Sequence, residues 1–184
     1  MNPSQELKKQ PLLAELLNET YSNLGLKAKA YSGNAFKRID GHHQNKLDLI
    51  IIDSPVIFHP ILKKPEVMRP IIGIEMKDKT SFGTITKGIT QTKKYFNYKY
   101  HLTPEHLDFE LNSLAFTTTN SIVTGIIDKD FKDNKAIERF AWNERIAILI
   151  NYKNKLVWSY RNYYFNLAGK KIGRFGEHAK FIKY

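Results

Sequence analysis

The fold of this 184-residue chain is decided by LDLIIID, at residues 47–53, and IIGIEMKD, at residues 71–78. Both segments are short, apolar and rich in β-branched residues, which indicates strands buried on both faces. A charged side chain is costly in such a strand unless it has a partner. Nevertheless, Asp48, Glu75 and Lys77 lie inside the two segments. These three residues are therefore candidates for function.

The alternation of side chains along a strand predicts how the charged residues meet. Successive side chains point to opposite faces, so Glu75 and Lys77 point the same way and Met76 points the other way. If Asp48 lies on the adjacent strand, two carboxylates and one ammonium group converge on one spot. Carboxylate oxygens suit a hard divalent cation that keeps several waters. The pattern therefore predicts an enzyme site beside a water and a phosphate.

An Asp, a variable gap and then Glu-x-Lys on the next strand resembles the signature of the PD-(D/E)XK nuclease superfamily. Asp48 matches the first position, Glu75 the second and Lys77 the third. Leu47 stands where the signature has proline, a position at which the family itself varies.

A second match lies in the segment QTKKY at residues 91–95. It is similar to the QxxxY element on the helix that follows the catalytic strand in the RecB-like and lambda-exonuclease branch. Gln91 and Tyr95 match the two positions of that element. The resemblance covers about residues 10–120, and it implies that Gln91 and Tyr95 belong to the catalytic site.

The resemblance implies an α/β fold with a central mixed β-sheet flanked by helices, the restriction-endonuclease-like core. A chain of 184 residues is long enough for one well-buried domain. We therefore expect a single nuclease-like domain over residues 1–184, with its core at about 10–120. Residues 121–184 would supply a C-terminal hairpin and a basic tail.

The resemblance also implies Mg²⁺ or Mn²⁺ as cofactor, held by Asp48, Glu75 and the backbone carbonyl of Met76. Lys77 would orient or deprotonate a water, or neutralise charge on the phosphate. The family often adds a helical acid near the metal, and Glu15 or Glu19 could be that acid. A buried Glu–Lys ion pair is the structural alternative, although such a pair contributes little net stability.

The charge of the chain favours DNA as partner. There are 29 Lys and Arg against 18 Asp and Glu, a formal charge of +11, and a basic surface attracts phosphate backbones. An AT-rich genome is the alternative source of the many lysines. The candidate DNA-contacting residues are Lys79, Lys87, Lys94, Lys170, Lys171 and Arg174.

Periodicity and breakers predict the other elements. We expect helices over residues 11–24, 85–98 and 135–142, and strands over residues 27–39, 47–53, 71–78, 113–118, 145–152 and 156–160. The strand at 27–39 should break near residues 32–34, a turn should occupy 41–45, and four prolines should make 55–70 irregular. In the helix at 85–98, Ile85, Ile89 and Phe96 should face the sheet, with Gln91 and Tyr95 on the flank.

Composition excludes several other classes. Cysteine is absent, so there is no disulfide framework or zinc-finger ligand set. No apolar run approaches the ~20 residues that a membrane span needs, and the polar first ten residues are unlike a secretory signal. A cytoplasmic location is therefore expected.

Together these patterns predict a metal-dependent deoxyribonuclease that hydrolyses phosphodiester bonds. A nuclease-fold DNA-binding protein without cleavage, or an RNA-cleaving nuclease of the same fold, are the alternatives. Endonuclease and exonuclease action, and the preferred strand structure, are not distinguished. The same holds for a homodimer and for a larger replication, repair or defence complex.

Overall fold

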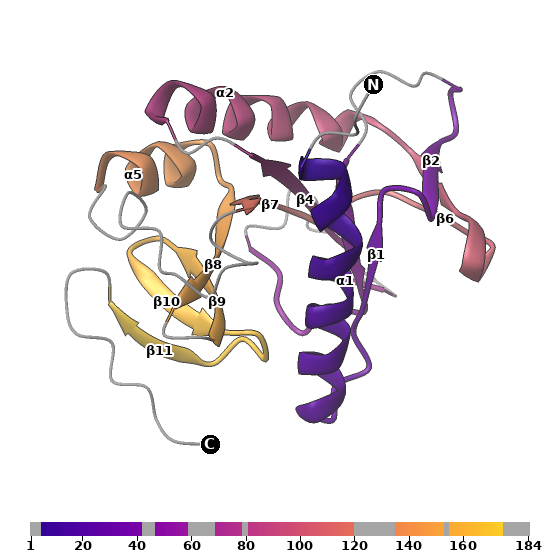
Figure 1. Cartoon of the computed structure of the whole chain (residues 1–184), viewed down its shortest axis with the longest axis horizontal. Helices are drawn as coiled ribbons and strands as arrows, with labels where there is room; N and C mark the ends of the chain where they lie inside the picture. Colours follow the sequence, from indigo (N-terminus) through magenta and orange to yellow (C-terminus); the bar gives the residue numbers. More distant parts are fainter. Residues whose placement is uncertain are drawn as a thin grey trace.

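Eight strands form one mixed sheet at the centre of the protein (Figure 1). The computed structural model describes residues 5–41, 47–58, 69–78, 81–119, 135–152 and 155–174. The strands, in their order across the sheet, are β1 (Lys29–Ser32), β3 (Leu49–Ile52), β4 (Ile72–Lys77), β7 (Ser113–Thr118), β8 (Ala147–Tyr152), β9 (Lys155–Tyr160), β10 (Tyr163–Asn166) and β11 (Lys171–Arg174).

The direction of the strands changes on both sides of a parallel centre. β4, β7 and β8 run parallel to one another, whereas β3 is antiparallel to β4 and β1 is antiparallel to β3. On the other side, β8 to β11 form an antiparallel meander. Parallel strands covered on both faces carry near-continuous apolar sequence. β7 accordingly has only buried residues, and β4 is buried from Ile72 to Met76. β3, although antiparallel to its neighbours, is also fully buried.

Helices cover both faces of the sheet. The described residues include the α-helices α1 (Gln5–Asn23), α2 (Phe82–Lys93) and α5 (Lys135–Asn143). The apolar face of α1 packs with Leu49, Ile51 and Ile74 on one face of the sheet. α2 and α5 pack on the opposite face, over a core that includes Ile50 and Phe116 (Figure 1). This arrangement confirms the expected mixed α/β fold with a central sheet flanked by helices.

A second, three-stranded antiparallel sheet lies beside the α2 layer. It consists of β2 (Phe36–Arg38), β5 (Tyr100–Leu102) and β6 (Leu107–Phe109), with a 3₁₀ turn, η2 (Thr103–Glu105), between β5 and β6. Tyr100 and Phe109 stack with ring centroids 5.3 Å apart, and the Tyr100 hydroxyl donates to the backbone carbonyl of Tyr95 (3.4 Å). The small sheet therefore packs against the segment that carries Tyr95.

Most of the predicted elements are confirmed. β3, β4 and β7 lie within the segments predicted as strands, and β8 and β9 form the predicted hairpin. The strand expected at residues 27–39 breaks, as predicted, between β1 and β2. The predicted turn at 41–45, the connection at 55–70 and the tail at 169–184 fall largely outside the described residues.

Two predicted helices have different bounds. α1 begins at Gln5 and contains Pro11 in its interior, where we had placed the helix start. Proline removes one helical hydrogen bond, but burial of Leu13, Leu17 and Tyr21 against the sheet favours a continuous helix. The prediction that α1 stops before Gly25 is correct, since Gly25 has a φ of +66°.

The second predicted helix is shorter than expected. α2 ends at Lys93 and continues as a 3₁₀ turn, η1 (Lys94–Asn97). Because a 3₁₀ turn has three residues per turn and an α-helix has 3.6, the phase of the side chains changes there. Tyr95 is consequently fully buried, where we had placed it on the flank, and Phe96 is only partly buried.

The sequence predictions omitted β5, β6, β10 and β11. The first two have only three residues each, and β11 contains a glycine and two charged residues around Ile172. Such segments lack the periodicity that identifies a strand, and their pairing depends on the tertiary fold.

None of the described helices is long and apolar enough to cross a membrane.

Candidate functional site

Asp48 and Glu75 lie opposite one another at the end of β3. The pairing of Leu49 with Ile74 in the antiparallel ladder brings the preceding Asp48 level with Glu75. The Asp48 amide donates to the carbonyl of Ile74, the residue that pairs with Leu49 (3.2 Å), which holds the backbone of Asp48 against β4. Both side chains are buried, with 7% of Asp48 and 1% of Glu75 exposed. The predicted convergence of the two carboxylates is therefore confirmed.

Two donors hold the Asp48 carboxylate. The Met76 amide donates to Oδ2 (2.7 Å), and the side-chain Nε2 of Gln10 donates to Oδ1. Gln10 is buried on α1 and was missed by the sequence prediction, because a single neutral amide on a helix carries no distinguishing pattern. It lies beside Asp48, where the resemblance led us to expect an acid. Glu15 and Glu19, the two predicted candidates for that acid, are exposed on α1.

Gly33 packs against the backbone that carries Asp48. Its amide donates to the Asp48 carbonyl (2.7 Å). A Cβ atom at this position would lie 2.9 Å from the Leu47 carbonyl oxygen and 3.3 Å from that of Asp48. Only glycine allows this close approach, so the loop between β1 and β2 positions Asp48 from the side opposite to β4.

The Glu75 carboxylate binds one residue from its own strand and one from η1. Its Oε1 forms an ion pair with Lys77 Nζ, and its Oε2 accepts a hydrogen bond from the Tyr95 hydroxyl (2.8 Å). Gln91 Nε2 donates in turn to the Tyr95 hydroxyl oxygen (2.9 Å). The Gln91–Tyr95 pair is therefore joined to the acid of the Glu-x-Lys segment by direct hydrogen bonds.

Burial dominates the electrostatics of the site. It raises the pKa of Glu75, while the positive charge of Lys77 and the hydrogen bonds from Lys77, Tyr95 and Asp48 act in the opposite direction. Burial and the adjacent Glu75 carboxylate also raise the pKa of Tyr95. Tyr95 therefore keeps its proton and remains a donor to Glu75 at any ordinary pH.

Gly88 allows α2 to lie close to β4. A Cβ atom there would meet Phe116 Cε2 at 2.5 Å and Lys77 Cγ at 3.1 Å. The helix thus packs directly on the aliphatic stem of Lys77, which is 22% exposed. This contact directs the ammonium group toward Glu75 and away from the apolar layer.

The residues present suit a divalent cation. The carboxyl groups of Asp48 and Glu75 are close enough to hydrogen-bond to one another, and two such groups repel when both are ionised unless a cation lies beside them. The Met76 amide points to the β3 edge. The carbonyl of a strand residue points to the same edge as its amide, so the Met76 carbonyl faces the side of Asp48.

The described residues contain no cluster of three or more His, Cys, Asp or Glu side chains. Two carboxylates with a backbone carbonyl and waters are nevertheless a sufficient ligand set for Mg²⁺, which binds through one or two carboxylates. Asp48, Glu75 and the Met76 carbonyl are the residues that would hold it.

The predicted DNA-contacting residues lie in two separate regions. Lys87 and Lys94 are exposed on α2 and η1, near Gln91. Lys170, Lys171 and Arg174 are at β11, five strands from β4, a separation of roughly 24 Å at the usual strand spacing. The ammonium of Lys171 lies over the Tyr163 ring, 3.3 Å from its centroid. The structure therefore does not bring the second group to the site, and Lys79 lies outside the described residues.

Comparison of the chain with protein-family models, with curated proteins and with solved structures gives no match.

Proposed function

We propose that this protein is a Mg²⁺- or Mn²⁺-dependent nuclease that hydrolyses phosphodiester bonds in DNA. The observation that supports the proposal most strongly is the arrangement of Asp48, Glu75 and Lys77. Two buried carboxylates face each other across neighbouring strands, and an ammonium group forms an ion pair with one of them. The net basic charge of the chain suits a polyanionic substrate.

A purely structural ion pair explains this arrangement less well. Such a pair needs one acid for each base, and replacing it with apolar residues is often neutral or stabilising. Here a second buried acid, Asp48, lies close enough to hydrogen-bond to Glu75, so the cluster holds two acids for one base. Ionisable groups buried together in this way are typical of functional sites, where charge is kept for chemistry.

Each residue has a defined part in the proposed reaction. A bound Mg²⁺ or Mn²⁺ would supply the Lewis acid that polarises the phosphodiester and lowers the pKa of a bound water. Asp48 and Glu75 would ligate it, kept in orientation by Gln10 and Tyr95. Lys77 reaches the site from the partly exposed end of β4. Its ammonium group would orient the attacking water or neutralise charge that develops on the phosphate.

The proposal is tested by cleavage of labelled linear and circular DNA with and without Mg²⁺. We expect the wild-type protein to cut only with the metal, and Asp48→Asn and Glu75→Gln each to abolish cleavage. Each amide keeps one acceptor oxygen, which can serve the Met76 amide in Asp48→Asn and the Tyr95 hydroxyl in Glu75→Gln. The Gln10 amide can turn so that its own oxygen accepts from the new NH₂ group, so the variants should remain folded. Glu110→Gln is the matched control, because Glu110 is an exposed acid on another part of the surface.

Cleavage at the wild-type rate by either variant would show that the catalytic site lies elsewhere. Absence of cleavage by the wild-type protein on every DNA and metal tested would overturn the nuclease proposal.

A further inference from the structure

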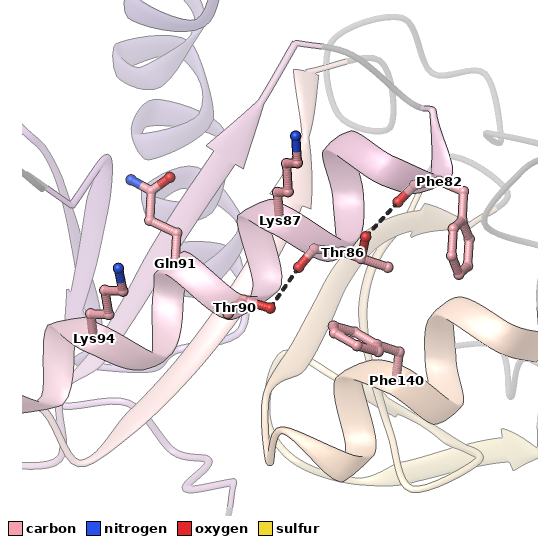
Figure 2. A pocket seen from close by; sticks show the side chains of 7 residues that line it. All are labelled: Phe82, Thr86, Lys87, Thr90, Gln91, Lys94 and Phe140. Atoms are coloured by element: carbon pink, nitrogen blue, oxygen red, sulfur yellow. Dashed lines mark hydrogen bonds between the residues drawn. The ribbon is translucent and has the colours of Figure 1, made fainter.

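An open pocket of about 490 Å³ lies between α2 and α5. Figure 2 shows Phe82 of α2 and Phe140 of α5 on opposite sides of the space between the two helices. Phe82 is 51% exposed, and Phe140 is partly buried against the main core. Two phenyl rings therefore border the pocket, and neither is fully buried in the core.

Thr86 and Thr90 line the pocket between the rings and Gln91. The Thr86 hydroxyl donates to the Phe82 carbonyl (3.0 Å), and the Thr90 hydroxyl donates to the Thr86 carbonyl (3.0 Å). Both hydroxyl protons are therefore used within the helix. This side of the pocket offers flat rings and methyl groups but no donor to a charged ligand.

A cationic stripe borders the pocket on its other side. Lys87, Gln91 and Lys94 follow one another at helical spacing, and in Figure 2 their side chains extend on the same side of the helix. The neighbouring Lys93 is paired with Glu144 (2.9 Å). By contrast, among the described residues no ion pair involves Lys87 or Lys94. The pocket thus has positively charged side chains along one side of α2 and aromatic rings along the other.

We propose that this pocket binds an unpaired segment of a nucleic-acid strand, with phosphates on Lys87 and Lys94 and a base against Phe82 and Phe140. Single strands are bound in this way, by a basic groove and by stacking of bases on aromatic rings. A duplex keeps its base faces stacked inside, so it can use only the lysines. This inference rests on the proposed function and gives it a substrate class, a strand that is single or locally unpaired.

Gln91 connects the pocket to the proposed catalytic residues. It lines the pocket and donates to the Tyr95 hydroxyl, which donates to Glu75. A nucleic-acid strand bound along Lys87 and Lys94 would therefore pass beside Gln91, which is hydrogen-bonded through Tyr95 to Glu75.

The test is the affinity of the full chain for a fluorescently labelled single-stranded oligonucleotide and for a duplex of equal length, measured by anisotropy without divalent metal. We expect Phe82→Ala to weaken single-strand binding about 5- to 100-fold, the effect of losing one stacked base. Duplex affinity should change less than about twofold, and Phe82→Tyr should retain single-strand binding.

Trp142→Ala is the matched control. Trp142 is an exposed aromatic residue on α5 that does not line the pocket.

The two lysines are tested by the salt dependence of binding. We expect Lys87→Ala and Lys94→Ala each to make the negative slope of log affinity against log salt less steep, by about 0.7 for the single strand. Lys37→Ala, at an exposed lysine on β2, should not change the affinity for the single strand.

The proposal is overturned if Phe82→Ala binds the single strand as tightly as the wild-type protein does, or if it loses single strand and duplex equally. It is also overturned if an acidic peptide competes as well as the oligonucleotide, because the pocket would then recognise charge alone. The pocket proposal and the nuclease proposal can be refuted independently of each other. A wild-type protein that binds through Phe82 but never cuts refutes the nuclease, whereas one that cuts with no contribution from Phe82 refutes the pocket.

Discussion

At the scale of single residues, neutral side chains keep the charged ones in place. Gln10 and Tyr95 each donate to one of the two carboxylates, although they come from different helical segments on opposite faces of the sheet. A carboxylate that accepts two good hydrogen bonds loses orientational freedom. The two donors therefore set the direction of the acids before any cation or substrate arrives.

A third buried acid, Glu138, predicts how the free energy of unfolding depends on pH. Burial raises the pKa of Glu138 to about 7, although the Ser159 hydroxyl donates to its Oε1 (2.7 Å). The folded protein thus keeps this proton up to about pH 7, whereas the unfolded chain releases it near pH 4.5. Folding stability should be fully present below that pH and should fall, by roughly 3 kcal/mol at most, as pH rises to about 7.

We expect Glu138→Gln to remove this pH dependence, since the amide cannot ionise and still accepts from Ser159. Urea unfolding of the wild type and the variant between pH 4.5 and 8 measures the difference in slope. Glu110→Gln, at an exposed acid, should keep the wild-type slope. An unchanged slope in Glu138→Gln would mean that this carboxyl is not the group that titrates.

At the scale of elements, two glycines of α2 predict opposite effects of the same substitution. A Cβ on Gly88 would overlap the Phe116 ring and touch Lys77, whereas a Cβ on Gly83 meets nothing within 4 Å. Overpacking costs about 1–3 kcal/mol, and replacing helical glycine with alanine gains up to ~1 kcal/mol.

Gly83→Ala should therefore stabilise the protein, and Gly88→Ala should destabilise it and lower cleavage by moving α2 away from Lys77. Thermal unfolding and the cleavage rate of both variants check this. Equal changes in melting temperature for the two variants would contradict the close packing of α2 on β4.

The elements also show which parts of the fold can be predicted from sequence. β3 and β4 can be recognised because every position except the charged ones is apolar or glycine, and most of them are isoleucine. Their pairing is expected because they follow one another in the chain. β5 and β6 are too short to show a period, and only their packing around Tyr100 makes them strands. The end of α2 at Lys93 depends on the burial of Tyr95, which is a tertiary contact.

At the scale of the whole molecule, the basic residues fall into two groups that the sequence does not separate. Lys87 and Lys94 line the same pocket as Gln91, while Lys170, Lys171 and Arg174 belong to the far edge of the sheet. Their separation follows from the strand order, in which β7 to β10 lie between them. The carboxylate pair was predictable because both acids interrupt apolar strands. Gln10 was not, because its partner is 38 residues away and only the packing of α1 brings them together.

The central claim, that Asp48, Glu75 and Lys77 form a nuclease site, is tested most directly by the cleavage rate of a folded Lys77→Met protein with Mg²⁺. Methionine keeps the apolar stem against Gly88 and removes only the charge. The account predicts a loss of about 100-fold or more, with Mg²⁺ binding and the melting temperature largely retained. Cleavage at the wild-type rate would contradict it, as would a loss of about 3–5 kcal/mol of stability, the effect of breaking a buried structural ion pair.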